Sequence, residues 1–342
     1  MKKVAVVLMN LGGPTDLKAV RPFLFNLFYD RAILRLSNPW RWVLAKIISW
    51  RRTSEATEIY KNLGGKSPLL EETQNQARGL EKLLGKDFKV FVSMRYWHPF
   101  SHEAVQEVIS YDPEEIVLLP LYPQFSTTTT KSSIEDFQKE LQKVGWKKEA
   151  TPIPCFFHLK EFLDVMEAGV RQEYARAKKY GTPRILWTAH GLPKKIIEEG
   201  DPYQWHVEKT VSYLEERLQD VGPFEGVTCY QSRVGPLEWI GPYTDDEIKS
   251  AGKERAPLVV VPIAFVSEHS ETLVELDMEY KELAEESGVP FYGRVSTVRD
   301  HPEFLEGLKK LVLGAPQRKC TQCELCSEPQ VRRCSSYLQS CK

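Results

Sequence analysis

The sequence predicts an α/β protein of two doubly wound domains, each built around a four-stranded parallel sheet. Its 342 residues exceed the ~100–200 residues of a single small domain. Eight short apolar runs predict strands, four in each half of the chain. The longer segments between them, such as residues 133–144 and 206–219, repeat apolar residues at helical spacing.

The strands alternate with helices along the whole chain. They are expected at residues 4–9, 88–94, 116–121, 151–156, 184–188, 226–231, 258–264 and 289–295. Strands separated by helices cannot pair as hairpins, so we expect parallel sheets covered on both faces. Ligands of such sheets bind beyond the carboxyl ends of the strands. We expect a first domain at 1–157, a second at 158–313 whose last helix packs on the first, and a tail at 314–342.

The composition is that of a folded soluble enzyme, with 42% hydrophobic and 27% charged residues. The 46 Lys and Arg residues balance 47 Asp and Glu residues, so no overall positive field favours nucleic acid. No apolar run reaches the ~18 residues needed to span a bilayer, and the first residues do not resemble a signal peptide. We therefore expect a cytoplasmic protein.

Chemically capable side chains follow two predicted strands of the second half. His190 lies two residues after the run 184–188, and His269 follows residues 258–264. Glu271, Glu275 and Glu279 then recur every four residues, so they share one side of a helix. Such a row is often a solvated acidic face. Beside a histidine at a strand end, it also suits a divalent metal and proton removal.

Seven blocks of sequence resemble the ferrochelatase family, in order, over about residues 3–313. They are MNLGGP (9–14), GKSPL (65–69), MRYWHPF (94–100), LYPQFSTTT (121–129), TAHGLP (188–193), YQSRVGPLEWIGP (230–242) and PIAFVSEHSETLVELDMEY (262–280). The resemblance implies insertion of Fe(II) into protoporphyrin IX, which releases two protons and completes haem synthesis. It also implies two Rossmann-like domains with the porphyrin in a cleft between them.

The resemblance assigns the metal and the chemistry to the second half of the chain. It places the metal-binding and catalytic histidine at His190 and its paired glutamate at Glu271. It continues the acidic row through Glu275 and Glu279 on a helix that is wide-turned in family members. Sequence does not divide metal binding from proton abstraction between His190 and Glu271. His269 resembles a second histidine of the same site. The equal alternative is that His269 is a residue at the helix start that orients Glu271.

The family's porphyrin contacts fall on seven positions, namely Leu11, Arg95, Tyr96, Tyr122, Ser126, Trp239 and Phe265. Arg95 suits a porphyrin propionate, because its planar fork matches a carboxylate. The aromatic residues among them have a structural alternative, which is packing in the core at strand ends.

The segment at 20–52 is apolar, aromatic and basic, with Asp30 as its single acid. Trp40, Trp42 and Trp50 suit a membrane interface, and the basic residues suit anionic lipid. The segment therefore predicts peripheral membrane contact. The alternative is a helical hairpin that covers the cleft, and both can hold together.

Five cysteines gather in the tail, namely Cys320, Cys323, Cys326, Cys334 and Cys341. Some ferrochelatases carry a 2Fe-2S cluster on a carboxyl-terminal extension, and this spacing is compatible with cluster ligation. We predict such a cluster on Cys320, Cys323, Cys326 and Cys334, with Cys341 as a substitute ligand. Structural zinc, another type of cluster and free thiols are the alternatives. Cys155 is expected to be a buried structural cysteine.

Other functions remain open at this level. A coproporphyrin III ferrochelatase, or another tetrapyrrole chelatase, shares these motifs. A non-catalytic haem- or metal-binding protein shares the two-domain architecture, but it does not need a row of carboxylates beside a histidine.

Overall fold

The computed structural model describes residues 3–148 and 150–315. By their contacts they form two compact units, residues 3–155 with 308–315, and residues 156–307. The boundary falls two residues before the predicted one. Each unit holds one four-stranded parallel sheet, in the orders β2-β1-β3-β4 and β6-β5-β7-β8.

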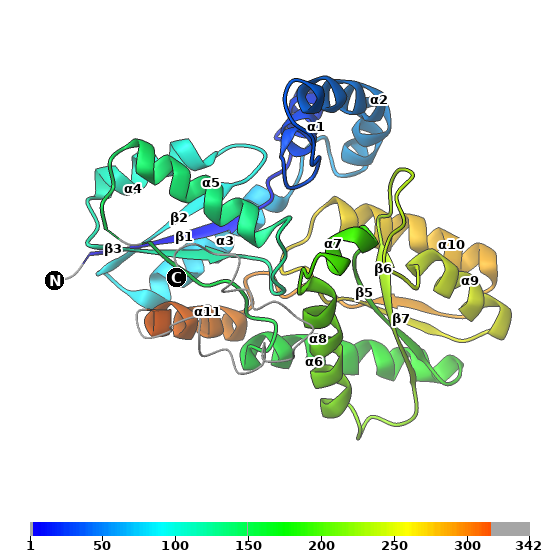
Figure 1. Cartoon of the computed structure of the whole chain (residues 1–342). Coiled ribbons are helices and arrows are strands. Elements are labelled where there is room, and N and C mark those ends of the chain that lie inside the picture. The colour runs from blue at the N-terminus through cyan, green and yellow to red at the C-terminus, as the bar shows by residue number, and fades with distance from the viewer. Residues whose placement is uncertain (1–2, 149, 316–342) are drawn as a thin grey trace. The chain divides into compact units, whose positions relative to one another are not determined.

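The first unit follows the predicted alternation of strands and helices. Its elements are β1 (Val4–Asn10), η1 (Leu17–Ala19), α1 (Val20–Tyr29), α2 (Trp40–Asn62), α3 (Leu69–Leu84), β2 (Phe88–Met94), α4 (Ser101–Tyr111), β3 (Glu115–Pro120), α5 (Thr130–Lys143) and β4 (Ala150–Pro152). Every residue of β1 is buried, as expected for a central parallel strand covered on both faces. In Figure 1, α4 and α5 lie over one side of this sheet.

The second unit repeats the pattern. Its elements are α6 (Lys160–Ala177), η2 (Lys178–Tyr180), β5 (Arg184–His190), α7 (Lys194–Glu198), α8 (Tyr203–Arg217), β6 (Glu225–Gln231), α9 (Thr244–Glu254), β7 (Leu258–Pro262), η3 (Glu271–Glu279), α10 (Tyr280–Ser287) and β8 (Tyr292–Arg294). Helices α6 and α8 pack on one face of the sheet, and α9 and α10 on the other (Figure 1). The last helix, α11 (Pro302–Gly314), divides between the two units at Leu308.

Two parallel four-stranded sheets among helices confirm the predicted α/β class. The predicted bounds of some strands were wrong. The strand expected at 151–156 is β4, and it ends at Pro152, so Cys155 is buried but lies after the strand. The runs at 258–264 and 289–295 give the shorter strands β7 and β8. Apolar character alone does not distinguish a strand from a buried loop.

The α1–α2 hairpin packs through its own apolar cluster. Phe23, Leu24, Phe28 and Tyr60 are buried there with Tyr96, which follows β2. In the part of the chain that the structure describes, no helix is both long enough and apolar enough to cross a membrane.

Candidate active site

The strands of the second sheet bring two residues together at one edge. His190 is the last residue of β5 and lies beside Gln231, the last residue of β6. Gly191 follows, where an added Cβ would lie 3.1 Å from the Gln231 carbonyl and from the Trp239 ring. A larger residue at this position would displace the turn that presents the histidine.

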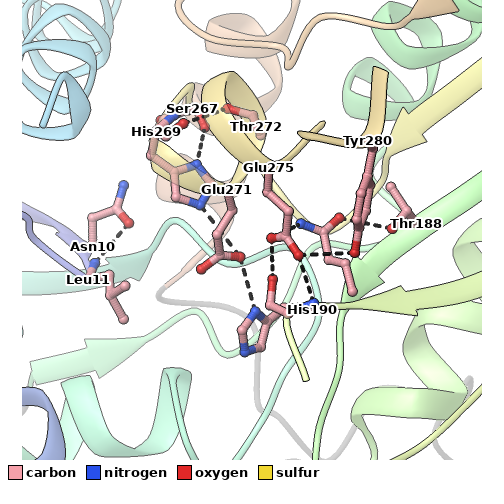
Figure 2. Close-up of polar contacts among 12 residues, drawn as sticks. Asn10, Leu11, Thr188, His190, Ser267, His269, Glu271, Thr272, Glu275 and Tyr280 are labelled. Atoms are coloured by element: carbon pink, nitrogen blue, oxygen red, sulfur yellow. Dashed lines mark hydrogen bonds and ion pairs between the residues drawn. The ribbon is translucent and has the colours of Figure 1, made fainter. Parts of the chain in front are cut away.

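His190 and Glu271 contact each other directly. Nδ1 of His190 lies 3.0 Å from Oε2 of Glu271, and Figure 2 shows Glu271 reaching His190 from the helix η3. The Tyr203 hydroxyl donates to the His190 carbonyl at 3.0 Å. The Trp239 ring meets the imidazole edge-on, with centroids 6.2 Å apart. With Nδ1 engaged by the carboxylate, Nε2 is the nitrogen left to face a substrate.

The charges of this pair reinforce each other. Burial disfavours the imidazolium, but the negative charge and hydrogen bond of Glu271 outweigh it and raise the pKa of His190. Burial likewise disfavours the carboxylate, yet His190 and then His269 hold the pKa of Glu271 well below its usual range. His190 is therefore a stronger base than an isolated imidazole, and Glu271 stays ionised.

His269 stands on the other side of Glu271 (Figure 2). Its Nδ1 donates to the Ser267 carbonyl at 3.1 Å, because a carbonyl can only accept. Its Nε2 lies 3.8 Å from Oε2 of Glu271, and the Phe265 ring packs against it with centroids 4.7 Å apart. Glu271 thus has an imidazole on either side.

Glu275 is held separately by hydrogen-bond donors. The Ser232 backbone N–H donates to its Oε1 at 2.9 Å, and the Ser232 hydroxyl donates to Oε2. Gln231 Nε2 donates to Oε2 and the Tyr280 hydroxyl to Oε1, each at 3.0 Å. Burial and then the charge of Glu271 nevertheless raise the pKa of Glu275. The pKa values of Glu271 and Glu275 are therefore shifted in opposite directions, although both residues lie on one helix.

The residues that hold Glu275 were missed by sequence reasoning. Gln231 is the last residue of the strand predicted at 226–231, and Ser232 directly follows it, so the rule that selected His190 could have found them. Thr188 donates to the Gln231 amide oxygen at 2.9 Å, which turns the amide nitrogen toward Glu275. Ser232 has a positive φ of 63°, a conformation that is uncommon outside glycine and frequent at functional sites.

The helix that carries the acidic row is a nine-residue π-helix, η3. The wide turn implied by the family resemblance is therefore present in this chain. Thr272, Val274 and Leu276 bury one side of η3, Glu271 and Glu275 are half-buried, and Glu279 is exposed. The row thus runs from the half-buried His190–Glu271 pair toward solvent.

The predicted porphyrin contacts of the first unit lie at the carboxyl edge of its own sheet. Leu11 follows β1, and its carbonyl accepts the Tyr96 N–H at 2.9 Å. Arg95 and Tyr96 follow β2, and Tyr122 follows β3. The Tyr122 hydroxyl pairs with Ser133 at 3.4 Å, and buried Ser126 pairs with Thr128 at 2.8 Å.

Arg95 already has protein partners. Its Nη2 lies 3.0 Å from Asp30 Oδ2, its Nε donates to the Ser132 hydroxyl at 2.8 Å, and Asp136 lies 3.6 Å away. The Tyr96 hydroxyl also donates to Asp30, at 2.7 Å. Asp30 therefore joins the end of α1 to the end of β2. The role of Arg95 toward a propionate stays a prediction, as do the other porphyrin contacts.

Within residues 3–148 and 150–315, no group of three or more His, Cys, Asp or Glu side chains is arranged to hold a metal ion. The five tail cysteines lie outside the described residues. The prediction of a cluster on them is not tested by this structure.

Comparison with known proteins identifies the family. The family model described as Ferrochelatase matches residues 3–315. The chain belongs to the ferrochelatase family. It is 47% identical over 320 residues to the ferrochelatase of Wolbachia sp. subsp. Drosophila simulans (strain wRi), covering 92% of this chain and 100% of that one. It is 48% identical to the ferrochelatase of Caulobacter vibrioides (strain NA1000 / CB15N), covering 91% and 90%. The predicted family and enzyme class are confirmed.

Solved structures support the fold. The chain matches SirB from Bacillus subtilis with Fe3+ at a TM-score of 0.54 and 12% identity, over 94% of this chain and 98% of that one. The sirohydrochlorin chelatase SirB from Bacillus subtilis subspecies spizizenii in complex with cobalt matches at 0.50 and 13%, over 94% and 98%.

Proposed function

We propose that this member of the ferrochelatase family inserts Fe(II) into protoporphyrin IX, with His190 and Glu271 at the reacting centre. The observation that supports the proposal most is the direct His190–Glu271 pair at 3.0 Å. It leaves His190 Nε2 to receive a pyrrole N–H proton, while the ionised carboxylate stabilises the imidazolium that results. Metallation releases two protons and transfers no electrons.

Two carboxylates of different proton affinity divide the tasks of metal contact and proton release. Because Glu271 has a lowered pKa, it stays a carboxylate suited to Fe(II). Because Glu275 has a raised pKa, it is the better acceptor for a proton leaving the site. Glu279, which is exposed, would complete the path toward solvent. A site that offers the metal few protein ligands suits this reaction, because the metal must then be transferred to the porphyrin.

The test uses His190→Ala in an anaerobic assay with Fe(II) and either protoporphyrin IX or coproporphyrin III, read by product mass. We expect the natural chain to make protohaem and the variant to make none, while the variant still binds porphyrin, since stacking does not use the imidazole. Normal turnover by the variant would contradict the assignment of His190. Iron coproporphyrin as the preferred product would replace the proposed substrate.

We further propose a 2Fe-2S cluster on Cys320, Cys323, Cys326 and Cys334. Four thiolates around two irons give a red-brown protein containing iron and sulfide. Single Cys→Ser changes across the five tail cysteines should bleach four variants and spare Cys341→Ser. A colourless protein with one zinc per chain would replace the cluster with a structural zinc site and leave the proposed reaction unaffected.

We also propose that the protein is cytoplasmic and contacts the inner membrane face through residues 20–52. Support comes from one face of α2, where Trp40, Val43, Ile47 and Trp50 are exposed at helical spacing. Trp40 and Trp50 are 68% and 64% exposed. A row of exposed apolar residues on a basic segment suits an anionic lipid surface.

A further inference from the structure

The π-helix η3 needs contacts from outside itself. Helices of this kind are rare and usually last a single turn, whereas η3 continues for nine residues, and the Tyr280 N–H still bonds to the Glu275 carbonyl five residues back. The backbone hydrogen bonds of η3 alone therefore do not account for its length. The residues that hold it decide where Glu271 and Glu275 point.

One arginine contacts acidic residues around both ends of η3. Arg294 is the last residue of β8, and its side chain is 9% exposed. Its Nη1 donates to both carboxylate oxygens of Glu268, at 2.9 and 3.1 Å. Its Nε and Nη2 donate to the two oxygens of Asp277, each at 2.6 Å. Glu268 lies three residues before η3, and Asp277 lies in its last turn.

Two further contacts from the same region support this arrangement. Tyr292, two residues earlier on the same face of β8, donates its hydroxyl to the Leu276 carbonyl of η3 at 2.6 Å. The Thr297 backbone N–H donates to Glu268 at 3.0 Å. The buried charges of Arg294 and Glu268 are thus matched by hydrogen bonds, which is the condition for tolerating them in a protein interior.

We propose that Arg294 is a positioning residue for metallation, which sets the register of η3 so that Glu271 meets His190 and Glu275 meets Ser232. The inference rests on the proposed function, because Glu271 and Glu275 matter to it through their roles there. Along the chain, Glu271 and Glu275 both lie between Glu268 and Asp277, the two residues that Arg294 binds. A bidentate guanidinium suits this task, since its planar fork fixes an orientation that a lysine ammonium does not.

The test compares Arg294→Met and Arg294→Lys with a matched control, Arg184→Met. Arg184 is also a buried arginine between two carboxylates of the same unit, with Glu225 at 2.7 Å and Glu254 at 2.8 Å. It begins β5, so it lies at the opposite edge of the sheet from His190. Each variant is assayed for kcat with Fe(II) and protoporphyrin IX, for urea unfolding, and for Co(II) binding by visible absorption.

We expect Arg294→Met to lower kcat about 10- to 100-fold, the scale of a small misplacement of reacting groups. Arg294→Lys should recover only part of the loss, and Arg184→Met should lose stability with kcat near that of the natural chain. We also expect Arg294→Met to weaken or alter the Co(II) spectrum. Equal kcat losses in Arg294→Met and Arg184→Met would overturn the inference, because they would indicate a general loss of stability.

A double variant separates this inference from the proposed function. If Arg294 acts through Glu271, Glu271→Gln should cost much less in the Arg294→Met background than in the natural chain. Full additivity would overturn the inference. Near-normal activity of Glu271→Gln alone would instead overturn the proposed site. If Arg294→Met does not fold, the variants Asp277→Asn and Tyr292→Phe test the inference instead. We expect each to lower kcat several-fold. An unchanged kcat in both would overturn the inference.

Discussion

At the scale of single residues, the site is a histidine whose two nitrogens have different tasks. Nδ1 of His190 is bound to Glu271, so Nε2 remains for chemistry. The neighbours of Glu271 and Glu275 then give one carboxylate a lowered pKa and the other a raised pKa. Such a division of proton affinity between nearby groups is a mark of acid–base sites.

The first prediction concerns the order of importance along the acidic row. Glu271→Gln keeps the shape but removes the charge that stabilises the His190 imidazolium, so kcat should fall at least ~100-fold. Glu275→Gln should cost less, and Glu279→Gln, at an exposed position, should cost least. Steady-state assays of the three variants with Fe(II) and protoporphyrin IX measure this order. Equal effects at all three positions would contradict it.

At the scale of elements, the decisive feature is η3 and the residues that support it. Leu276 buries this helix against the core around Leu186, Ile248 and Val260, while its polar sides meet Ser232 and Arg294. A π-helix widens the turn, and the residues on it no longer follow ordinary α-helical spacing. The buried ion pair of Glu268 with Arg294 is therefore part of what defines the site.

The second prediction concerns pH and this ion pair. Burial disfavours the Glu268 carboxylate, but Arg294 and further hydrogen bonds outweigh it and lower its pKa. A carboxyl group whose pKa is lower when folded stabilises the protein fully above its unfolded pKa of ~4.3, and loses this as pH falls through the folded pKa. We expect Glu268→Gln to cost about 1–3 kcal/mol at pH 7, with the gap narrowing in acid.

Urea unfolding of the natural chain and of Glu268→Gln, at neutral pH and at successively lower pH, measures this gap. Glu107→Gln is a suitable control, because Glu107 is an exposed residue of α4 in the first unit. A gap that stays constant from neutral to acid pH would mean that the charge of Glu268 is not the stabilising feature.

At the scale of the whole molecule, the chain repeats one architecture twice and adds an α1–α2 hairpin to the first unit. The hairpin is joined to the sheet of that unit through Asp30, which accepts from Arg95, Tyr96 and Ser132. Phe23 and Phe28 pack in the buried cluster of the hairpin. The exposed tryptophans Trp40, Trp42 and Trp50 are not part of that cluster, as far as the described residues show.

The third prediction concerns these tryptophans. Trp40→Ser combined with Trp50→Ser should reduce cosedimentation with phosphatidylglycerol vesicles about tenfold, because the aromatic rings enter the interface. Binding of the natural chain should also weaken in high salt, since basic residues attract the anionic lipid. Tyr180→Ser, at a 55% exposed tyrosine of the second unit, is the control. Unchanged vesicle binding by the double variant would leave the hairpin without a membrane role.

Much of the architecture was predictable from sequence. Apolar runs and helical periodicity predicted eight strands and their places along the chain, because local pattern reports directly on burial. The order of the strands within each sheet was not predicted. His190 was found for a related reason, since the carboxyl ends of parallel strands are where such folds bind ligands. Bounds were less certain where apolar residues continue past a strand, as they do from Pro152 to Phe157.

Tertiary structure alone decided what each site residue touches. The sequence placed Arg95 among the porphyrin contacts, but its bond to Asp30 depends on a helix end 65 residues away. It selected Glu271 and Glu275 as one row, but not the partners that separate their pKa values. It contained no local signal that Arg294 would reach Glu268 and Asp277. A sequence pattern records which face of an element is buried, whereas pairings between distant side chains exist only once the strands and helices have packed.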